Sequence, residues 1–419
     1  MKKTLIITAI LLFVMNAEAQ DYYSAGYYEV NNGTIAALYK NNERVYTAHY
    51  TNRTSKAIKV ACNSQRDVFW MVYHYNYPSN TLSFTEIRKN NQVYASTENL
   101  GEIYIYDMYC LEDTLYYAGY QLNENGIAIA TVWKGEEFTT HWVLGDGIHA
   151  SVIYDAEVDK NTNIPYFCGY VSDSLHKASV WEASQLLYKQ EPSGSQRASW
   201  AKEISIDNGS IYTNGYLNYY TGYETVSIPT IWKDNVRIDN GSGLDFIDCL
   251  YAQQGDFYYT FFYPHGMYYA VYKNRSEILQ LPLDNQTGVQ RICGDLDDIY
   301  MVGVLQGQGC IWKNFEVYLH PNNCDYICDM VVSYASVSVD ETNENGFAVY
   351  PNPTNNILFV QTLRATSLPA ETYRITNLMG QTLLQGQITA ETQQINIENL
   401  PAGLYFISMG DMTQKFVVK

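Results

Sequence analysis

Positive charge is scarce in this chain of 419 residues. Lysine and arginine together number 26, against 44 aspartates and glutamates, and the formal net charge is −18 at pH 7. Nucleic acids and anionic membrane surfaces are bound through basic faces, because long-range electrostatics attract phosphate to them. The composition therefore argues against both classes of partner.

The short motifs that mark common chemistries are also missing. The sequence contains no GxSxG, no HExxH, no glycine-rich phosphate loop and no EF-hand loop. Asp295, Asp297 and Asp298 could offer oxygens to calcium, but they fall where a hairpin is expected, and we interpret them as a solvated turn. Four histidines in predicted loops belong to different repeats and indicate no shared metal site: His149, His176, His265 and His320. We expect no metal and no cofactor.

Long apolar runs are confined to the amino terminus. Residues 1–19 combine Lys2 and Lys3, an apolar stretch over 5–15 and the small-residue pattern Ala17-x-Ala19, which is typical of a cleaved signal peptide. The stretch is about half as long as a bilayer-spanning helix requires. We therefore expect export after removal of 1–19 and no membrane insertion.

Helical periodicity is absent, since apolar residues alternate or run in short blocks as they do in strands. A unit typified by residues 113–135, DTLYYAGYQLNENGIAIATVWKG, recurs about every 40–50 residues. It joins an aromatic strand ending in Gly-Tyr to a second strand ending in Trp-Lys. Across seven copies the glycine slot holds Gly26, Tyr73, Gly119, Gly169, Gly215, Phe261 and Gly303. The aromatic slot of the second strand holds Tyr39, Arg88, Trp133, Trp181, Trp232, Tyr272 and Trp312.

Two further strands complete each copy, and four short strands per repeat are typical of a propeller blade. We expect the glycine where neighbouring sheets approach closely, and the aromatic ring between blades. The first Gly-Tyr strand, 22–28, has no inner strand before it, and the last inner strand, 326–332, has no Gly-Tyr strand after it. We predict that these two pair and close the ring, which removes exposed sheet edges. A tandem sandwich is the alternative.

The order of strands resembles that of kelch repeats, although this sequence has one glycine in the slot where kelch has two. The resemblance implies the topology and no kelch activity. The predicted fold is all-β, a seven-bladed β-propeller over 20–333 followed by a small Ig-like β-sandwich.

The last part of the chain has a different pattern. Residues 334–346 are polar and acidic and are interpreted as a linker, and 347–419 contains seven short strands with Gly and Asn turns. Its segments VYPNPTNN, ITNLMGQTL, INIENLPAGLYFISM and KFVVK resemble the C-terminal sorting domain of type IX secretion cargo in Bacteroidetes-type bacteria. The resemblance implies that 347–419 engages the type IX secretion machinery, and that the protein is secreted or attached to the outer-membrane surface.

All eight cysteines lie between Cys62 and Cys328. An exported protein can form disulfides, and buried free thiols are the alternative. The predicted topology brings Cys310 and Cys324 to one rim across a single hairpin, so this is the pair we predict for a disulfide.

Aromatic residues give the candidate ligand-binding surface. The loop 217–227, LNYYTGYETVS, is the longest between first and second strands of a copy, and other aromatic loop residues share its end of the propeller. Tyrosines on loops held by a rigid scaffold suit protein or sugar recognition, although coincidence is the alternative in a chain with 40 tyrosines. The candidate residues are Tyr77, Tyr219, Tyr220, Tyr223, Tyr263 and His265.

Two functions remain open. The first is an exported propeller that binds a glycan or a protein through this loop face. The alternative is a secreted polysaccharide-active hydrolase or lyase, which requires two carboxylates roughly 5–10 Å apart in a pocket. We favour the first and assign no catalytic residue.

Overall fold

The computed structural model describes residues 20–334 and 347–418, with gaps at 32, 191–195, 242–244, 264–267, 283–286, 296–297, 351–353, 355, 363–370, 378–380, 389–391, 402 and 410–411. The predicted signal peptide, most of the predicted linker, His265 and Asp297 lie outside the described residues. No helix that could cross a membrane occurs in the described part of the chain. The chain divides into two compact units, of which one is Gln20–Tyr334 and the other includes Ala335–Lys419.

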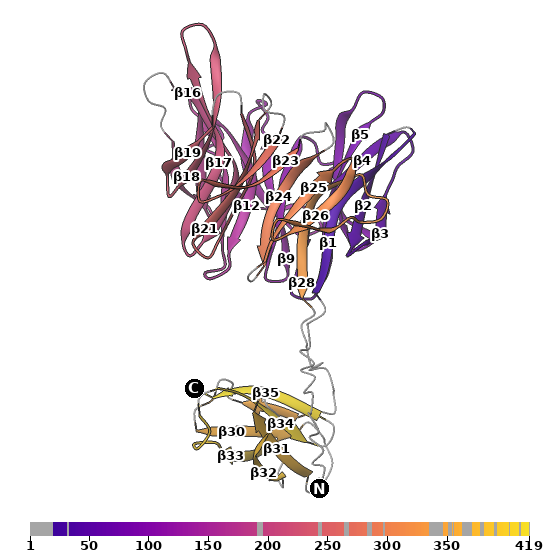
Figure 1. Ribbon diagram of the computed structural model, residues 1–419, viewed down its shortest axis with the longest axis vertical. Helices are drawn as coiled ribbons and strands as arrows, with labels where there is room; N and C mark the ends of the chain where they lie inside the picture. Colours follow the sequence, from indigo (N-terminus) through magenta and orange to yellow (C-terminus); the bar gives the residue numbers. More distant parts are fainter. Residues whose placement is uncertain are drawn as a thin grey trace, which may run out of the picture. The chain divides into compact units, whose positions relative to one another are not determined.

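Seven four-stranded antiparallel sheets make up the described part of Gln20–Tyr334 (Figure 1). The first sheet consists of β28 (Tyr326–Tyr334), β1 (Gln20–Val30), β2 (Gly33–Lys40) and β3 (Glu43–Ala48). The second consists of β4 (Arg53–Cys62), β5 (Val68–Asn76), β6 (Thr81–Lys89) and β7 (Gln92–Ser96). The third consists of β8 (Ile103–Leu111), β9 (Thr114–Leu122), β10 (Ala128–Lys134) and β11 (Thr139–Val143).

The remaining four sheets repeat the same strand order. The fourth consists of β12 (Ala150–Asp159), β13 (Ile164–Ser172), β14 (His176–Glu182) and β15 (Gln185–Lys189). The fifth consists of β16 (Gln196–Asp207), β17 (Ser210–Tyr220), β18 (Thr225–Lys233) and β19 (Val236–Asn240). The sixth consists of β20 (Phe246–Gln253), β21 (Asp256–Tyr263), β22 (Tyr268–Lys273) and β23 (Ser276–Pro282). The seventh consists of β24 (Gly288–Asp295), β25 (Asp298–Leu305), β26 (Gln308–Lys313) and β27 (Glu316–Leu319).

The first strands of the seven sheets form a closed cycle. Each contacts the first strand of the next sheet, in the order β28, β4, β8, β12, β16, β20 and β24, and β24 contacts β28. The predicted closure is confirmed, because Tyr22 of β1 pairs with Val332 of β28, and Tyr27 pairs with Tyr326. Four-stranded sheets in this arrangement fit a β-propeller.

A bulge interrupts each first strand opposite the glycine slot. It presses a carbonyl against the glycine, so that a Cβ on Gly119 would lie 1.9 Å from the Tyr104 oxygen. The close approach that requires glycine is therefore between two strands of one sheet, and the prediction that neighbouring sheets approach there was wrong. In the second sheet the residue opposite the bulge is Val72. The repeat pattern in the sequence had placed the next residue, Tyr73, in this slot.

The four tryptophans of the aromatic slot lie in the core, as predicted. Trp133, Trp181, Trp232 and Trp312 are 1–2% exposed. Trp133 packs with Phe69 and Met71 of the preceding sheet, so its ring fills the space between two sheets. Large apolar side chains of this kind stabilise the contact between sheets by removing their area from water.

The second unit contains the seven strands predicted for it. One sheet has the order β29 (Phe347–Tyr350), β30 (Ile357–Thr362) and β33 (Thr392–Asn396). The other has the order β32 (Thr382–Ile388), β31 (Glu371–Asn377), β34 (Gly403–Met409) and β35 (Met412–Val418). Leu358 and Ile395 of the first sheet share one core with Ile407 and Phe416 of the second.

Replacing Trp133 with alanine should lower the free energy of unfolding of Gln20–Tyr334 by about 3–5 kcal/mol, because the deletion leaves a cavity between two sheets. Tryptophan fluorescence during guanidinium unfolding measures this unit alone, since 347–419 contains no tryptophan. Tyr223→Ala is the control, because that ring is 98% exposed. Equal stabilities for the two variants would contradict the assigned role of the ring.

Candidate functional site

Charged side chains occupy one repeated position, directly after the bulge of the first strand. In an otherwise apolar strand this position turns a charge toward the neighbouring sheets, because a bulge re-aims the side chains around it. The residues come from six of the seven sheets: Lys59, Asp107, Asp155, Glu203, Arg291 and Asp329. We call this set the inner charged ring.

Two cations hold three of the four carboxylates of the inner charged ring together. Lys59 Nζ lies 2.8 Å from Asp107 Oδ1 and 3.3 Å from Asp155 Oδ1. Arg291 Nη1 lies 3.3 Å from the same oxygen of Asp155, and Arg291 Nε lies 3.8 Å from Asp329 Oδ1. These ion pairs join side chains of the first, second, third, fourth and seventh sheets. Within the described part of the chain, no group of three or more His, Cys, Asp or Glu could hold a metal ion.

The same carboxylates also bond the backbone of the next sheet. The Val60 N–H donates to Asp329 Oδ2 at 3.0 Å, and the Ala156 N–H donates to Asp107 Oδ2 at 2.9 Å. The Ile204 N–H donates in the same way to Asp155 Oδ2 at 3.0 Å. We call these bonds carboxylate latches; each satisfies an N–H on the edge of a first strand that has no partner strand on that side. The latches therefore couple the first sheet to the second, the third to the fourth and the fourth to the fifth.

Burial and neighbouring charges move the pKa values of the ring apart. Burial raises the pKa of Asp155, but Arg291 and Lys59 outweigh it and lower the value to about 2. Burial raises the pKa of Asp107 to about 7, with Lys59 opposing. Burial likewise raises the pKa of Glu203 to about 8 and that of Glu157, on the same strand as Asp155, to about 7. Within the ring, the pKa of Asp155 is thus lowered, whereas the pKa values of Asp107 and Glu203 are raised to about 7 and about 8.

Half-buried tyrosine rings form a second repeated feature beside the inner charged ring. Most follow the glycine slot on the second strand or lie on the facing first strand. The set, which we call the central aromatic belt, is Tyr27, Tyr73, Tyr104, Tyr106, Tyr120, Tyr154, Tyr170 and Tyr326. Each of these residues keeps part of its surface exposed to solvent.

Ring contacts connect the belt within and between sheets. Tyr27 stacks on Tyr326 at 5.1 Å, and Tyr104 stacks on Tyr120 at 4.7 Å. Tyr106 crosses from the third sheet to Tyr154 of the fourth at 5.3 Å.

Further ring contacts, a hydrogen bond and a cation–π contact extend the central aromatic belt. Tyr154 lies 6.0 Å from Tyr170, and Tyr170 lies 4.4 Å from His176. The Tyr73 hydroxyl donates to the Ile105 carbonyl of the next sheet. Lys56 Nζ lies 4.7 Å over the Tyr27 ring, which joins the first and second sheets by a cation–π contact.

Three of the predicted loop tyrosines share the β17–β18 hairpin. Tyr223 at the tip is 98% exposed, and Tyr220 is 42% exposed. Tyr219 is half-buried, and its hydroxyl accepts hydrogen bonds from Gln196 and Arg237 at 3.0 and 3.2 Å. The hairpin extends beyond the other turns of its unit in Figure 1. This part of the predicted face is therefore available to a partner.

The other predicted site residues do not join this hairpin. Tyr77 is 53% exposed but lies in the β5–β6 turn of the second sheet. Tyr263 is half-buried, its hydroxyl is 2.9 Å from that of Tyr272, and its ring packs against Phe261. His265 falls outside the described residues. The structure thus leaves Tyr220 and Tyr223 exposed on one hairpin and Tyr77 exposed on another turn, while Tyr263 is half-buried.

The predicted disulfide between Cys310 and Cys324 is absent, since both residues are free thiols. Cys324 lies opposite Gly309, whose N–H donates to its carbonyl at 2.8 Å. Cys310 is the next residue and its side chain packs on the other face of the sheet, with Val289 and Trp312. The prediction placed the two backbones correctly and failed because successive side chains of a strand point to opposite faces.

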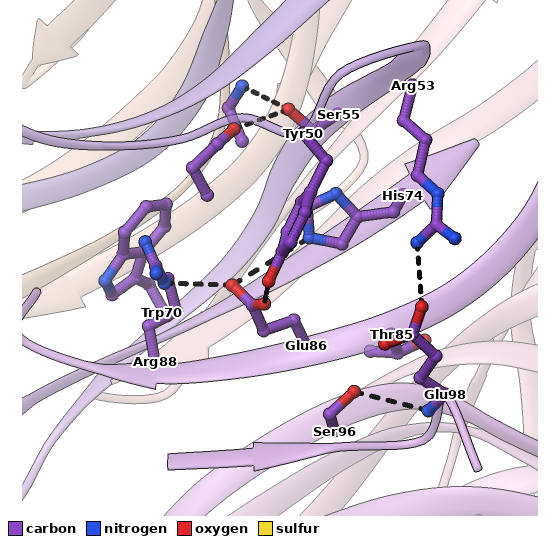
Figure 2. A network of polar contacts seen from close by, with 12 residues as sticks. Tyr50, Arg53, Ser55, Trp70, His74, Thr85, Glu86, Arg88, Ser96 and Glu98 are labelled. Carbon is purple, nitrogen blue, oxygen red and sulfur yellow. Dashed lines mark hydrogen bonds and ion pairs between the residues drawn. The ribbon is translucent and has the colours of Figure 1, made fainter. Parts of the chain in front are cut away.

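The second sheet departs from the repeat, and Figure 2 shows how it is accommodated. Arg88 fills the aromatic slot; its guanidinium lies 5.7 Å from the centre of the Trp70 ring, and its Nε lies 2.9 Å from Glu86 Oε1. The Tyr50 hydroxyl donates to Glu86 Oε2 at 2.5 Å, and His74 Nε2 lies 3.9 Å from Oε1. Burial acts to raise the pKa of Glu86, but His74, Tyr50 and Arg88 outweigh it and lower the pKa. Glu86 and His74 are 1% and 0% exposed, so this network serves packing.

Sequence reasoning missed both the inner charged ring and the central aromatic belt. A signal for each was present. The predicted inner strands are mostly apolar but carry a charge near the middle, as in IYIYDMYC and YICDMVV. The tyrosine of the Gly-Tyr pair recurs with its glycine, at Tyr27, Tyr120, Tyr170 and Tyr216.

Comparison with known proteins confirms the recognition of the C-terminal domain. Residues 348–419 match the family model described as a secretion system C-terminal sorting domain. A domain of this family implies handling by the type IX secretion machinery, and therefore export. No curated protein shows significant similarity to the chain.

Solved structures similar to this chain include β-propeller proteins. PorZ, a surface component of the type IX secretion system of Porphyromonas gingivalis, is 11% identical with a TM-score of 0.29, over 92% of this chain and 74% of PorZ. The propeller domain of the Trilobed protease from Pyrococcus furiosus is 12% identical with a TM-score of 0.36, over 72% of this chain and 98% of that domain. The periplasmic gluconolactonase PpgL of Pseudomonas aeruginosa is 9% identical with a TM-score of 0.28, over 90% of this chain and 99% of PpgL. Likeness at this level carries no information on activity or ligand.

The raised pKa values of Asp107 and Glu157 predict a loss of stability as the pH rises toward neutrality. Asp107 and Glu157 bind protons more tightly in the folded than in the unfolded chain, so their contribution falls as pH rises from about 4 to about 7. Asp155 has the opposite sign: its contribution is present above about pH 4 and is lost as pH falls toward 2. Unfolding by guanidinium should therefore show lower stability at pH 8 than at pH 5.

Asp107→Asn should flatten this dependence between pH 5 and pH 8, because the amide still accepts the latch hydrogen bond and no longer titrates. Glu124→Gln is the matched control at an exposed position. If Asp107→Asn keeps the full difference between the two pH values, the assigned role of Asp107 is wrong.

Proposed function

We propose that this chain is an exported β-propeller binding protein that recognises a glycan or a protein at one end of its ring, after delivery by type IX secretion. In this proposal 1–19 is a cleaved signal peptide, 334–346 is a linker, and the processed protein is released or surface-attached. The seven sheets are the blades of one seven-bladed propeller, with the strand order of kelch repeats, and 347–419 is an Ig-like sandwich. The closed cycle of first strands supports the blade count.

The observation that carries the binding role is the position of the tyrosines. The belt tyrosines of the second strands come directly after the glycine slot, on the side where each second strand ends. The β17–β18 turn and the β5–β6 turn lie at this same end. One end of the ring therefore presents exposed rings at turns and half-buried rings beside the first strands. Aromatic side chains on rigid strands bind ligands at little cost in conformational entropy.

The alternative of a hydrolase or lyase receives no comparable support. Asp107 and Asp155 lie against one lysine, as paired carboxylates of a catalytic site would. They are only 3% and 1% exposed, however, and both hold backbone N–H groups of the next sheet. Carboxylates that are buried and bonded in this way stabilise the contacts between sheets and are not positioned to contact a substrate.

Export should depend on the tail. A chain truncated after Asn345 should fold its propeller but stay inside the cell in the native host, because it lacks the sorting domain. Fractionation followed by immunoblotting checks this. As a control, a reporter with a signal peptide and 346–419 attached should appear outside the cell. A truncated chain that is exported normally would contradict the role assigned to the tail.

Binding is tested by screening the mature chain against glycan and protein arrays. Tyr220→Ala and Tyr223→Ala should weaken binding of a ligand that reaches the β17–β18 hairpin. Tyr318→Ala is the matched control, because this residue is similarly exposed, at 43%, but lies on β27, the outermost strand of a different sheet. A chain that binds no ligand of either class would overturn the proposed function.

A further inference from the structure

The central aromatic belt concentrates rings at a place where packing alone does not require them. The cores between sheets are already filled by buried residues such as Trp133 and Trp181. The belt rings stay half-buried, and their contacts run from Tyr106 across to Tyr154 and on to Tyr170. Half-buried tyrosines offer a ligand an apolar face and a hydroxyl at once.

The closed cycle of first strands limits what can reach the belt. Tyr104, Tyr106, Tyr154 and Tyr326 lie on those strands. A folded protein partner needs an accessible patch of about 800 Å² on each side, which residues on the innermost strands of a closed cycle do not present. A narrow, extended chain is a better fit.

The strand edges favour a saccharide chain over a peptide chain. An extended peptide binds to a sheet by pairing its backbone with free N–H and C=O groups at an edge. Here the N–H groups of Val60, Ala156 and Ile204 on the first strands are already bonded by the carboxylate latches. A saccharide needs no ladder of backbone bonds, since its apolar faces pack on aromatic rings and its hydroxyls bond to side chains.

Charge favours a neutral saccharide. The chain carries a formal charge of −18, which repels polyanions at long range. Lys56, which contacts the belt, has its ammonium over the Tyr27 ring.

From these observations we propose that the central aromatic belt is the binding site for a neutral oligosaccharide, whose sugar rings stack on the tyrosines of the third and fourth sheets. This inference rests on the proposed binding function and assigns it a ligand class and a location. Tyr106 and Tyr154 carry the contact between these sheets, so they are the residues on which affinity depends most.

The test uses the full mature chain and neutral hexasaccharides of glucose, mannose and N-acetylglucosamine, with isothermal titration calorimetry. Hexagalacturonate and a proline-rich hexapeptide represent the acidic and peptide alternatives. Tyr106→Ala and Tyr154→Ala should each weaken binding of the preferred neutral hexasaccharide roughly tenfold. Tyr106→Phe keeps the ring and should retain most of the affinity, which separates a lost stacking face from a folding defect. Affinity should be equal at low and high salt.

Several results would overturn the inference while leaving the proposed function in place. One is saccharide binding that is lost in Tyr223→Ala and unchanged in both belt variants. Others are preferential, salt-sensitive binding of hexagalacturonate, binding of the peptide, or binding only to a folded protein on the array. The failure of every probe and array to bind would count against the inference and the proposed function together.

Discussion

The bulge in each first strand is the constraint on which the rest of the ring depends. It presses a carbonyl against the second strand, so glycine is required in five of the seven sheets, as at Gly119 and Gly169. The same bulge places a charged side chain where it can bond the next sheet, as Asp155 does with the Ile204 N–H. One local irregularity thus determines both a sequence preference and the coupling between sheets. Because every first strand is at an edge of its sheet, these latches satisfy donors that would otherwise be left without a strand partner.

The sequence predicted what periodicity can reveal. The seven copies, the closure of 326–332 beside 22–28, the buried tryptophans and the seven strands of the tail all follow from spacing and apolar pattern, and the structure contains each of them. Contacts that depend on the direction of a single side chain were harder. Cys310 was one residue away from the position opposite Cys324, and in a strand one residue reverses the face. Tyr263 was expected on the loop face and instead packs against Phe261.

The inner charged ring could not be predicted from alternation, because a bulge shifts the register at the very position where the charge lies. In the sequence, Asp107 is an isolated charge in an apolar strand. Its partner Lys59 becomes evident only in the folded structure, where the two side chains form an ion pair. The second sheet gives the same lesson. Arg88 looks like a defect in the aromatic slot, yet Trp70 across the strand pair supplies a buried ring and Glu86 neutralises the guanidinium. In the second sheet a buried ring is therefore kept, although it comes from Trp70 on the neighbouring strand.

Closure of the cycle by β28 makes the end of the propeller and the start of the tail neighbours along the chain. The strand that pairs with β1 ends at Tyr334, and the sorting domain begins to match its family at residue 348. A polypeptide that stops anywhere before β28 leaves the ring open and also lacks the segment that directs export. A chain that is long enough to include the sorting domain therefore also includes the strand that closes the ring. An incompletely synthesised chain lacks the segment that directs export.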